Sequence, residues 1–201
     1  MYIYIICGLY TIYVKMAKSW CIIDMFKALL MDEAAVVRAL KRISHEIIEK
    51  NNGVENVCLI GIKRRGVPLA QMIANNIAAI EDVKIPVGSV DISLHRDDVA
   101  VNPNDKKAPS VEIDFDITDK TVILVDDVLH TGRTVRAALE AVIESARPAS
   151  VQLAVLIDRG HRELPIRGDY VGKNVPTSKN EIINVNIPPY DKILAVELYE
   201  E

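Results

Sequence analysis

The sequence predicts an α/β fold in which a central, mainly parallel sheet is flanked by helices. Two observations predict it. Short, continuously apolar segments alternate along the chain with segments whose apolar residues recur at helical spacing. The apolar segments suit strands that are buried on both faces, as strands are in parallel sheets. With 201 residues, 50% of them hydrophobic, and no internal repeat, the chain is long enough for one such domain.

Each element has a local signal. Asp32 is an expected N-cap for the first helix, and Asn51-Asn52-Gly53 is its expected stop. Pro86 stands at the start of one strand, where a proline is tolerated. In chain order we expect a helix over 33–51, a strand over 56–62, a helix over 68–80, a strand over 85–94, a returning strand over 111–115, a strand over 121–125, a helix over 134–145, a strand over 151–157, and short strands over 182–185 and 193–196.

Two stretches carry no regular pattern. Residues 95–110 are polar and hold acidic residues, lysines and two prolines, so we expect a long loop, and long loops inside compact domains are often functional. Residues 158–178 are expected to be irregular.

The N-terminal run Tyr2–Val14 is apolar but shorter than the roughly 20 residues that cross a bilayer. No basic residue precedes it, and Lys15 and Lys18 follow it, so it does not read as a signal peptide. We expect residues 1–24 to be an extension without a role in function, Met25 to be the natural start, and 25–201 to be a single domain. A peripheral membrane anchor is the alternative.

Net charge and cysteine spacing limit the partners and the compartment that the sequence suits. A formal net charge of −4 gives no overall attraction to nucleic acid, so any RNA site must be a local basic surface. The three cysteines follow no disulfide or metal-ligand spacing, which indicates a cytoplasmic protein.

The stretch VILVDDVLHTGRT, residues 122–134, carries the clearest chemical signal. A buried strand leads into Asp126 and Asp127, and a short loop with Thr131, Gly132 and Thr134 opens the next helix. Backbone amides at a helix N-terminus together with hydroxyl groups form a phosphate cradle. A Walker loop is excluded because the Gly-Lys-Ser/Thr ending is missing. Two carboxylates ahead of a phosphate cradle suit the two hydroxyls of a ribose 5-phosphate.

This arrangement resembles the signature of type I phosphoribosyltransferases. The resemblance implies that Asp126 and Asp127 hold the ribose hydroxyls of phosphoribosyl pyrophosphate (PRPP), and that Thr131, Gly132, Arg133 and Thr134 hold its 5-phosphate. The full PRPP-binding stretch it implies is Val125, Asp126, Asp127, Val128, Leu129, His130, Thr131, Gly132, Arg133 and Thr134. His130 stands where purine-specific relatives carry an acidic residue, which favours a pyrimidine.

Two further cationic elements fit a pyrophosphate leaving group. The turn GIKRRG, residues 61–66, ends a strand and precedes a helix at the same sheet edge. In the family this is the pyrophosphate loop, so Arg65, together with Arg64, would bind phosphate oxygens with the fork geometry of guanidinium. Family position also gives Arg96, in the long polar loop, a place beside the leaving group. Mg²⁺ bound with PRPP is the implied cofactor, with no metal ligand set of the protein's own.

The segment 158–178, DRGHRELPIRGDYVGKNVPTS, is similar to the bifunctional pyrimidine-operon attenuator and uracil phosphoribosyltransferase family. The similarity runs from about Met25 to the C-terminus. It implies a small hood over the base in this segment, uracil read near Arg159 and Ile166, uridine monophosphate (UMP) as product, a homodimer or higher oligomer, and binding to the leader mRNA of pyrimidine genes.

Basic residues recur every three to four positions on the first expected helix, and this pattern indicates an RNA-binding surface independently of the resemblance. Further basic groups lie near the hood. The candidate RNA-binding residues are Arg38, Lys41, Arg42, His45, Lys50, Arg162, Arg167 and Lys173. Two alternatives stay open: an RNA-binding attenuator whose nucleotide site only senses, and a metabolic phosphoribosyltransferase for another base.

Overall fold

The computed structural model describes residues 2–7, 10–17, 20–92 and 110–200. The chain divides into two compact units, one made of residues 1–36 and 176–201, the other of residues 37–175. Arg96, a predicted leaving-group residue, lies outside the described residues. Among the described residues, no helix combines the length and the apolar character that a membrane span requires.

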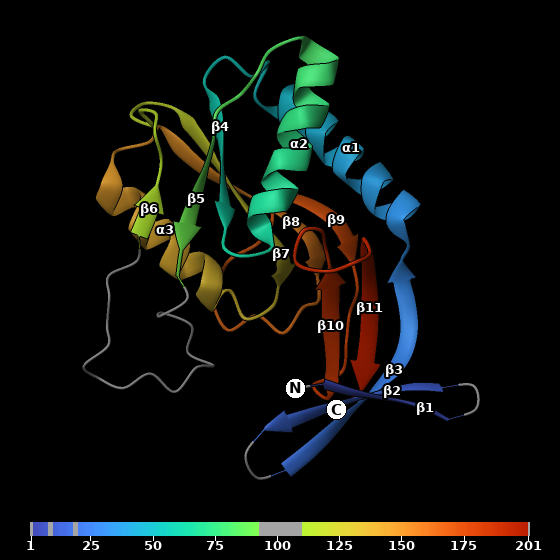
Figure 1. The fold of residues 1–201 in the computed structure, drawn as a ribbon. Helices are drawn as coiled ribbons and strands as arrows, with labels where there is room; N and C mark the ends of the chain where they lie inside the picture. The colour runs from blue at the N-terminus through green and yellow to red at the C-terminus, as the bar shows by residue number, and fades with distance from the viewer. Residues whose placement is uncertain (1, 8–9, 18–19, 93–109, 201) are drawn as a thin grey trace. The chain divides into compact units, whose positions relative to one another are not determined.

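The larger unit is built on a six-stranded sheet in the order β6-β5-β4-β7-β8-β9 (Figure 1). Every neighbouring pair is parallel except β5 with β6, which is antiparallel. Its strands are β4 (Val57–Ile62), β5 (Val87–Asp91), β6 (Ser110–Glu112), β7 (Thr121–Leu129), β8 (Ser150–Asp158) and β9 (Tyr170–Asn174). The mainly parallel sheet predicted from the sequence is confirmed.

The described residues form three helices: α1 (Glu33–Lys50), α2 (Gly66–Glu81) and α3 (Arg133–Ser145). The Asp32 carboxylate accepts a hydrogen bond from the backbone N–H of Ala35 at 2.7 Å, which confirms the predicted N-cap. Asn52 and Gly53 adopt positive φ angles of 53° and 110° after α1, so the predicted stop is confirmed as well. α3 buries one face against alternate residues of β4, β7 and β8, including Ile60, Leu124 and Leu153.

Two strands of this sheet, β7 and β9, differ most from the sequence prediction. β7 was expected to end at Val125 but continues to Leu129, because its parallel pairing with β8 runs through Asp126↔Val155 to Leu129↔Asp158. The predicted irregular stretch 158–178 contains β9, which pairs in parallel with β8. The sequence YVGKN of β9 is half polar and holds a glycine, so it lacks the apolar run that marks the other parallel strands.

The smaller unit holds a five-stranded antiparallel sheet in the order β1-β2-β3-β11-β10. Its strands are β1 (Tyr2–Cys7), β2 (Tyr10–Ala17), β3 (Trp20–Met31), β10 (Glu181–Asn186) and β11 (Ala195–Glu200). The Lys27 ammonium lies 2.5 Å from the Glu181 carboxylate, and this hydrogen bond is the main reason that the pKa of Glu181 is lowered. The prediction that residues 1–24 play no part in function stays a prediction.

Candidate active site

The Asp126–Asp127 pair lies within β7, near its carboxyl end. Asp126 is buried, with 6% of its surface exposed, and Asp127 is half-buried. Each carboxylate accepts a hydrogen bond from the next backbone N–H, Asp126 from Asp127 at 2.9 Å and Asp127 from Val128 at 3.0 Å. Successive side chains of a regular strand point to opposite faces. The more exposed Asp127 is therefore the more available of the two to a ligand.

The phosphate loop follows directly, as residues 130–132. Gly132 is the N-cap of α3 and has a φ of 92°, a left-handed conformation that glycine adopts without strain. Its carbonyl accepts the first helical bond, from Arg136 N–H at 2.9 Å. The loop therefore ends at the N-terminus of a 13-residue helix, and helix N-termini bind anions.

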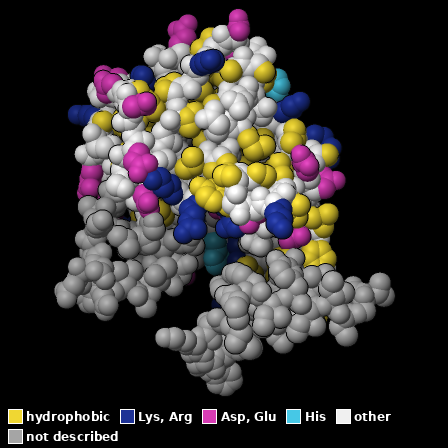
Figure 2. Space-filling model, viewed as in Figure 1, with side chains coloured by type: hydrophobic (Ala, Val, Ile, Leu, Met, Phe, Trp, Pro, Cys, Tyr) yellow, Lys and Arg dark blue, Asp and Glu magenta, His cyan; other side chains and the backbone are white. Residues whose placement is uncertain are grey.

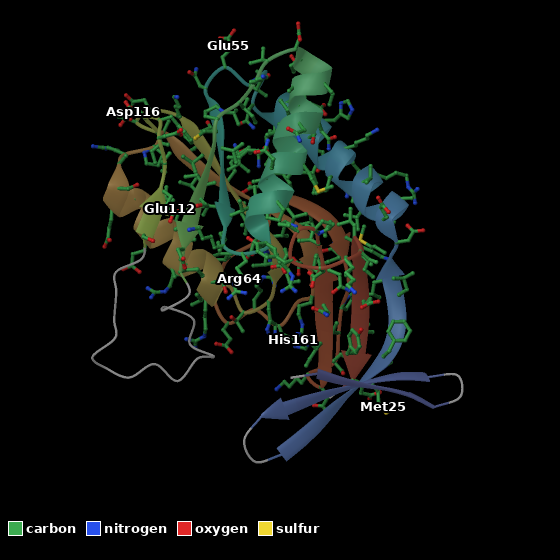
Figure 3. The ribbon with its side chains drawn as sticks, in the orientation of Figure 1. Met25, Glu55, Arg64, Glu112, Asp116 and His161 are labelled. Carbon is green, nitrogen blue, oxygen red and sulfur yellow. The ribbon has the colours of Figure 1, made fainter. Side chains whose placement is uncertain are left out.

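The turn between β4 and α2 is packed directly against β7. A side chain at Gly66 would place its Cβ 2.2 Å from the Val125 carbonyl oxygen and 3.4 Å from the Asp126 Cα. Only glycine permits this approach, so the turn lies beside the acidic pair. Arg64 is exposed and Arg65 is half-buried. In Figure 3, Arg64 and His161 lie at one end of the larger unit, whereas Glu55 and Asp116 lie at the other.

Lys63, the first cationic residue of this turn, forms an ion pair with a neighbouring strand of the sheet. Its ammonium lies 2.7 Å from the Glu112 carboxylate on β6. That contact, with a second hydrogen bond from Ser89, lowers the pKa of Glu112. Lys63 therefore ties the turn to the sheet, and the phosphate contacts of Arg64 and Arg65 stay a prediction.

The segment that contains the predicted uracil-binding residues packs on the phosphate loop. The Ile166 side chain lies 3.4 Å from the position that a Cβ at Gly132 would occupy. Arg159 is buried, with 8% of its surface exposed, and its N–H donates to the Leu129 carbonyl at 3.1 Å. The structure thus brings Arg159 and Ile166 to the loop. The Ile166 N–H donates to the Leu164 carbonyl and the Ile166 carbonyl accepts from Arg162 Nε, so the apolar side chain is the group that Ile166 offers most directly to a base.

His130 lies among cationic groups of this segment. Its ring is 6.0 Å from the His161 ring in an edge-to-face arrangement. Partial burial is the main cause that lowers the pKa of His130, and the positive charge of Arg159 adds to it. His130 therefore favours the neutral form, which can both donate and accept a hydrogen bond. Figure 2 shows Lys and Arg side chains gathered beside a histidine in the lower middle of this face.

Sequence reasoning missed the residues that hold the loop from behind. Arg133 forms an ion pair with Glu163 at 2.7 Å, and the Thr131 carbonyl accepts hydrogen bonds from the N–H groups of Glu163 and Leu164. Arg133, predicted to hold the 5-phosphate, therefore already has a carboxylate partner. No periodic pattern in the sequence indicates these contacts, because 30 residues separate Arg133 from Glu163.

The predicted RNA-binding residues come from two distant segments that the fold brings together. Arg42 on α1 donates to the carbonyls of Val171 and Gly172 on β9 at 2.9 and 2.7 Å. Lys50 on α1 lies 2.5 Å from the Asp169 carboxylate. The residues of the set that are exposed are Arg38, Lys41, Arg42, His45, Lys50, Arg167 and Lys173.

Three members of this set also hold the fold together. Arg42 and Lys50 fasten α1 to the β9 edge, and Lys50 additionally lies over the Tyr170 ring at 5.2 Å. Arg162 is mostly buried, with 20% of its side chain exposed, and its guanidinium contacts carbonyl groups. Their predicted RNA contacts are untested. Substituting any of them would disturb internal contacts as well as any contact to RNA.

Comparison with known proteins places this site in a family. Residues 29–192 match the phosphoribosyl transferase domain. The bifunctional protein PyrR of Acetivibrio thermocellus is 59% identical over 172 residues, which cover 86% of this chain and 94% of that protein. The chain belongs to the bifunctional PyrR family of phosphoribosyl transferases. The PyrR protein of Clostridium novyi is 57% identical over 176 residues, covering 88% of this chain and 99% of that one.

Solved structures support the fold of this PyrR-family chain at much lower identity. A hypoxanthine phosphoribosyl transferase of Trypanosoma cruzi matches with a TM-score of 0.67 and 17% identity, covering 86% of this chain and 91% of that one. A hypoxanthine-guanine phosphoribosyltransferase of Bacillus anthracis matches with a TM-score of 0.64 and 18% identity, covering 86% and 97%. The predicted type I phosphoribosyltransferase fold is confirmed.

The donor set of the site fits a magnesium ion that arrives with its substrate. Among the described residues, no group of three or more His, Cys, Asp or Glu side chains could hold a metal ion. The half-buried Asp127 offers carboxylate oxygens near the carboxyl end of β7, and the buried Asp126 is adjacent to it. Mg²⁺ is usually held by one or two carboxylates together with substrate phosphates and water. One such carboxylate is therefore sufficient for an ion that PRPP helps to bind.

Proposed function

We propose that this protein transfers the phosphoribosyl group of PRPP to uracil, giving UMP and diphosphate, and that with UMP bound it regulates pyrimidine genes by binding their leader mRNA. The observation that carries the transfer activity is the Gly66–Val125 approach, which brings the Arg64-Arg65 turn beside Asp126 and Asp127 at the edge where the phosphate loop begins. The regulatory half rests on the similarity to bifunctional PyrR proteins and on the joined basic segments of α1 and β9.

The substrate would lie along this edge in one orientation. The 5-phosphate binds the N–H groups and hydroxyls of residues 131–134 at the start of α3, and Asp126 and Asp127 hold the ribose hydroxyls. Arg65, with Arg64, then faces the diphosphate. The side chains of Asp126 and Asp127 would also hold Mg²⁺ together with PRPP oxygens, and the ion would supply positive charge against the departing diphosphate.

The chemistry needs position and charge more than covalent help. The bond from the ribose anomeric carbon to the diphosphate oxygen breaks and its electron pair leaves with the diphosphate. A uracil ring nitrogen forms the new bond and gives up its proton to the diphosphate or to solvent. The ribose passes through an oxocarbenium-like state. Carboxylates beside the ribose stabilise this cationic state, and guanidinium groups stabilise the leaving group. Arg96, which lies outside the described residues, is proposed to add positive charge beside the leaving group.

Uracil would lie between the phosphate loop and the segment 159–166. Ile166 provides an apolar contact next to Gly132, and Arg159 lies behind the Leu129 carbonyl. His130, held toward its neutral form, faces the same segment. A neutral histidine suits an uncharged pyrimidine better than the acidic residue that purine-specific relatives place there.

The proposed RNA surface is the exposed part of α1 together with the neighbouring residues near β9. Arg38, Lys41 and His45 follow one another at helical spacing and are exposed, and Arg167 and Lys173 are exposed on the other segment. These residues concentrate positive charge on one surface of a chain whose net charge is −4. An acidic protein needs such a local positive surface to bind RNA phosphates. The proposal places the protein in the cytoplasm as a homodimer or higher oligomer.

The experiment that tests the proposal measures UMP formation from labelled uracil, PRPP and Mg²⁺, with hypoxanthine, guanine and orotate as competing bases. We expect uracil-specific turnover. A gel-shift titration of pyrimidine leader RNA with and without UMP tests the second half, and we expect UMP to tighten binding. Turnover with a purine and no RNA affinity would instead indicate a metabolic enzyme. UMP-dependent RNA binding without turnover would indicate a nucleotide sensor.

A further inference from the structure

The carbonyl groups of three consecutive residues at the phosphate loop are all held by one short segment, residues 159–164. This segment follows β8 and packs against the loop. Two of these hydrogen bonds come from Nη1 of the Arg162 guanidinium, and three come from backbone N–H groups. The Leu129 carbonyl accepts from Arg159 N–H at 3.1 Å and Arg162 Nη1 at 3.2 Å, His130 from Arg162 Nη1 at 2.6 Å, and Thr131 from Glu163 N–H at 3.0 Å and Leu164 N–H at 3.1 Å.

Holding these carbonyls fixes the direction of the amides that would bind phosphate. The peptide bonds from Leu129 to Gly132 are trans, and a trans peptide carries its C=O and its N–H on opposite sides. The N–H groups of His130, Thr131 and Gly132 therefore point away from the bonds that their neighbouring carbonyls accept. Fixed amide dipoles bind an anion better than mobile ones, because no ordering is needed when the anion arrives.

Arg162 is the centre of this arrangement. Besides the loop carbonyls, its Nε donates to the Ile166 carbonyl at 2.9 Å and its Nη1 to the Gly160 carbonyl at 3.1 Å. Its Nη2 also pairs with the Asp158 carboxylate, and only 20% of the Arg162 side chain is exposed. One guanidinium thus joins the end of β7, the end of β8 and the Ile166 position beside Gly132.

We propose that Arg162 is a positioning residue of the transfer reaction, which holds the phosphate loop in its anion-binding conformation through the Leu129 and His130 carbonyls. The inference rests on the proposed function, since it assigns the loop to the 5-phosphate of PRPP and UMP. It gives Arg162 a role inside the protein, in place of the RNA contact that its charge alone suggested.

The chemistry of the guanidinium makes the role hard to replace. Its five N–H donors lie in a rigid plane and can serve several acceptors at once. Lysine keeps the charge beside Asp158 but offers a single ammonium centre, so it cannot reach both the loop carbonyls and Ile166. Glutamine also removes the charge and leaves Asp158 without this partner, which destabilises the local structure further.

The test compares Arg162→Lys and Arg162→Gln with Arg136→Gln as the matched control. Arg136 lies on α3, is exposed, and pairs only loosely with Glu140 at 3.5 Å. For each full-length variant we would measure kcat, the KM for PRPP and for uracil, and the binding constants of UMP and of uridine. Uridine is the matched ligand, because it lacks the 5-phosphate that the loop would hold. Circular dichroism and thermal unfolding show that each variant is folded.

We expect Arg162→Gln to raise the KM for PRPP and the Kd for UMP by about tenfold or more, the effect of about one strong interaction. Uridine binding and the KM for uracil should change by less than about twofold, since both ligands lack the 5-phosphate. Arg162→Lys should fall between, and Arg136→Gln should match the unaltered protein. If Arg162→Gln does not fold, Arg162→Lys carries the same test.

Two results would overturn the inference. One is a wild-type Kd for UMP in Arg162→Gln, above all with RNA affinity lost, which would return Arg162 to the RNA surface. The other is equal weakening of UMP and uridine, which would indicate a general structural role. If the unaltered protein binds UMP but does not form it, the proposed transfer activity is contradicted. The UMP and uridine binding constants of the Arg162 variants would still test whether Arg162 positions the phosphate loop.

Discussion

Substituting Gly66 by alanine tests the contact on which the proposed site depends. The added Cβ would lie 2.2 Å from the Val125 carbonyl oxygen and 3.2 Å from its carbon. Both atoms belong to the backbone of a central strand, so they cannot rotate away. The start of α2 would have to withdraw by roughly 1 Å to restore an ordinary contact. Overpacking of this kind costs about 1–3 kcal/mol, and the rigid neighbour places Gly66→Ala near 3 kcal/mol.

The same withdrawal would move Arg64 and Arg65 away from Asp126 and Asp127. A misplacement of about 1 Å in an active site can lower the rate about a hundredfold, so kcat/KM for PRPP should fall by that order. The assays are urea unfolding for stability and initial-rate kinetics for the transfer. Gly53→Ala is the control, because a Cβ there meets nothing within 4 Å and only the φ of 110° is strained. That variant should lose about 1 kcal/mol of stability and no activity.

A Gly66→Ala protein with unchanged stability and unchanged kcat/KM would refute the reasoning. It would mean that the turn does not approach Val125 as closely as described. Loss of stability without loss of activity would separate the packing from the chemistry, and the arginines of the turn would then have no part in the reaction.

Two further predictions concern other parts of the molecule. Lys41 is exposed on α1, so Lys41→Gln should weaken binding of leader RNA and lower the slope of its salt dependence by about one, with the transfer rate unchanged. The control is Lys84→Gln, the same substitution at an exposed position between α2 and β5. Equal RNA affinity in the two variants would contradict the RNA surface. His130 should titrate by NMR below its ordinary pKa of 6.5, because burial and Arg159 disfavour the charged ring. The unfolded chain then binds more protons between the two pKa values, so stability should fall as the pH drops through that window, and His130→Asn should flatten this dependence. A midpoint at or above 6.5 would contradict the described environment.

Much of the fold follows from local signals. The apolar spacing of α1, its Asp32 cap and the Asn52-Gly53 stop all agree, so its bounds were predicted to within a residue. The buried strands β4, β7 and β8 were found from their apolar runs. β9 was missed because its stability comes from pairing with β8 across the chain, a contact that no local pattern announces.

The site, like the fold, follows from local sequence patterns only in part. The order of strand, acidic pair, glycine and helix predicts where the phosphate loop lies, because each residue type has a local task there. The approach of Gly66 to Val125 and the hydrogen bonds of Arg162 depend on segments far apart in the sequence. These contacts could not be derived without the three-dimensional fold.

Charge alone does not show which partner a basic side chain contacts. Arg42, Lys50 and Arg162 were assigned to RNA because basic residues on a helix or loop suggest phosphate contacts. In the structure Arg42 binds two β9 carbonyls, Lys50 binds Asp169, and Arg162 binds loop carbonyls. A guanidinium or ammonium group serves a carbonyl as readily as a phosphate, and only the fold shows which is near.

The most direct test of the central claim is the transfer rate of the double variant Asp126→Asn with Asp127→Asn. The two amides keep the size of the side chains but remove the charge that would hold the ribose and stabilise its cationic state. We expect UMP formation to be lost, with the thermal unfolding transition retained. Wild-type turnover in this folded double variant would contradict the assignment of the active site to β7 and its loop.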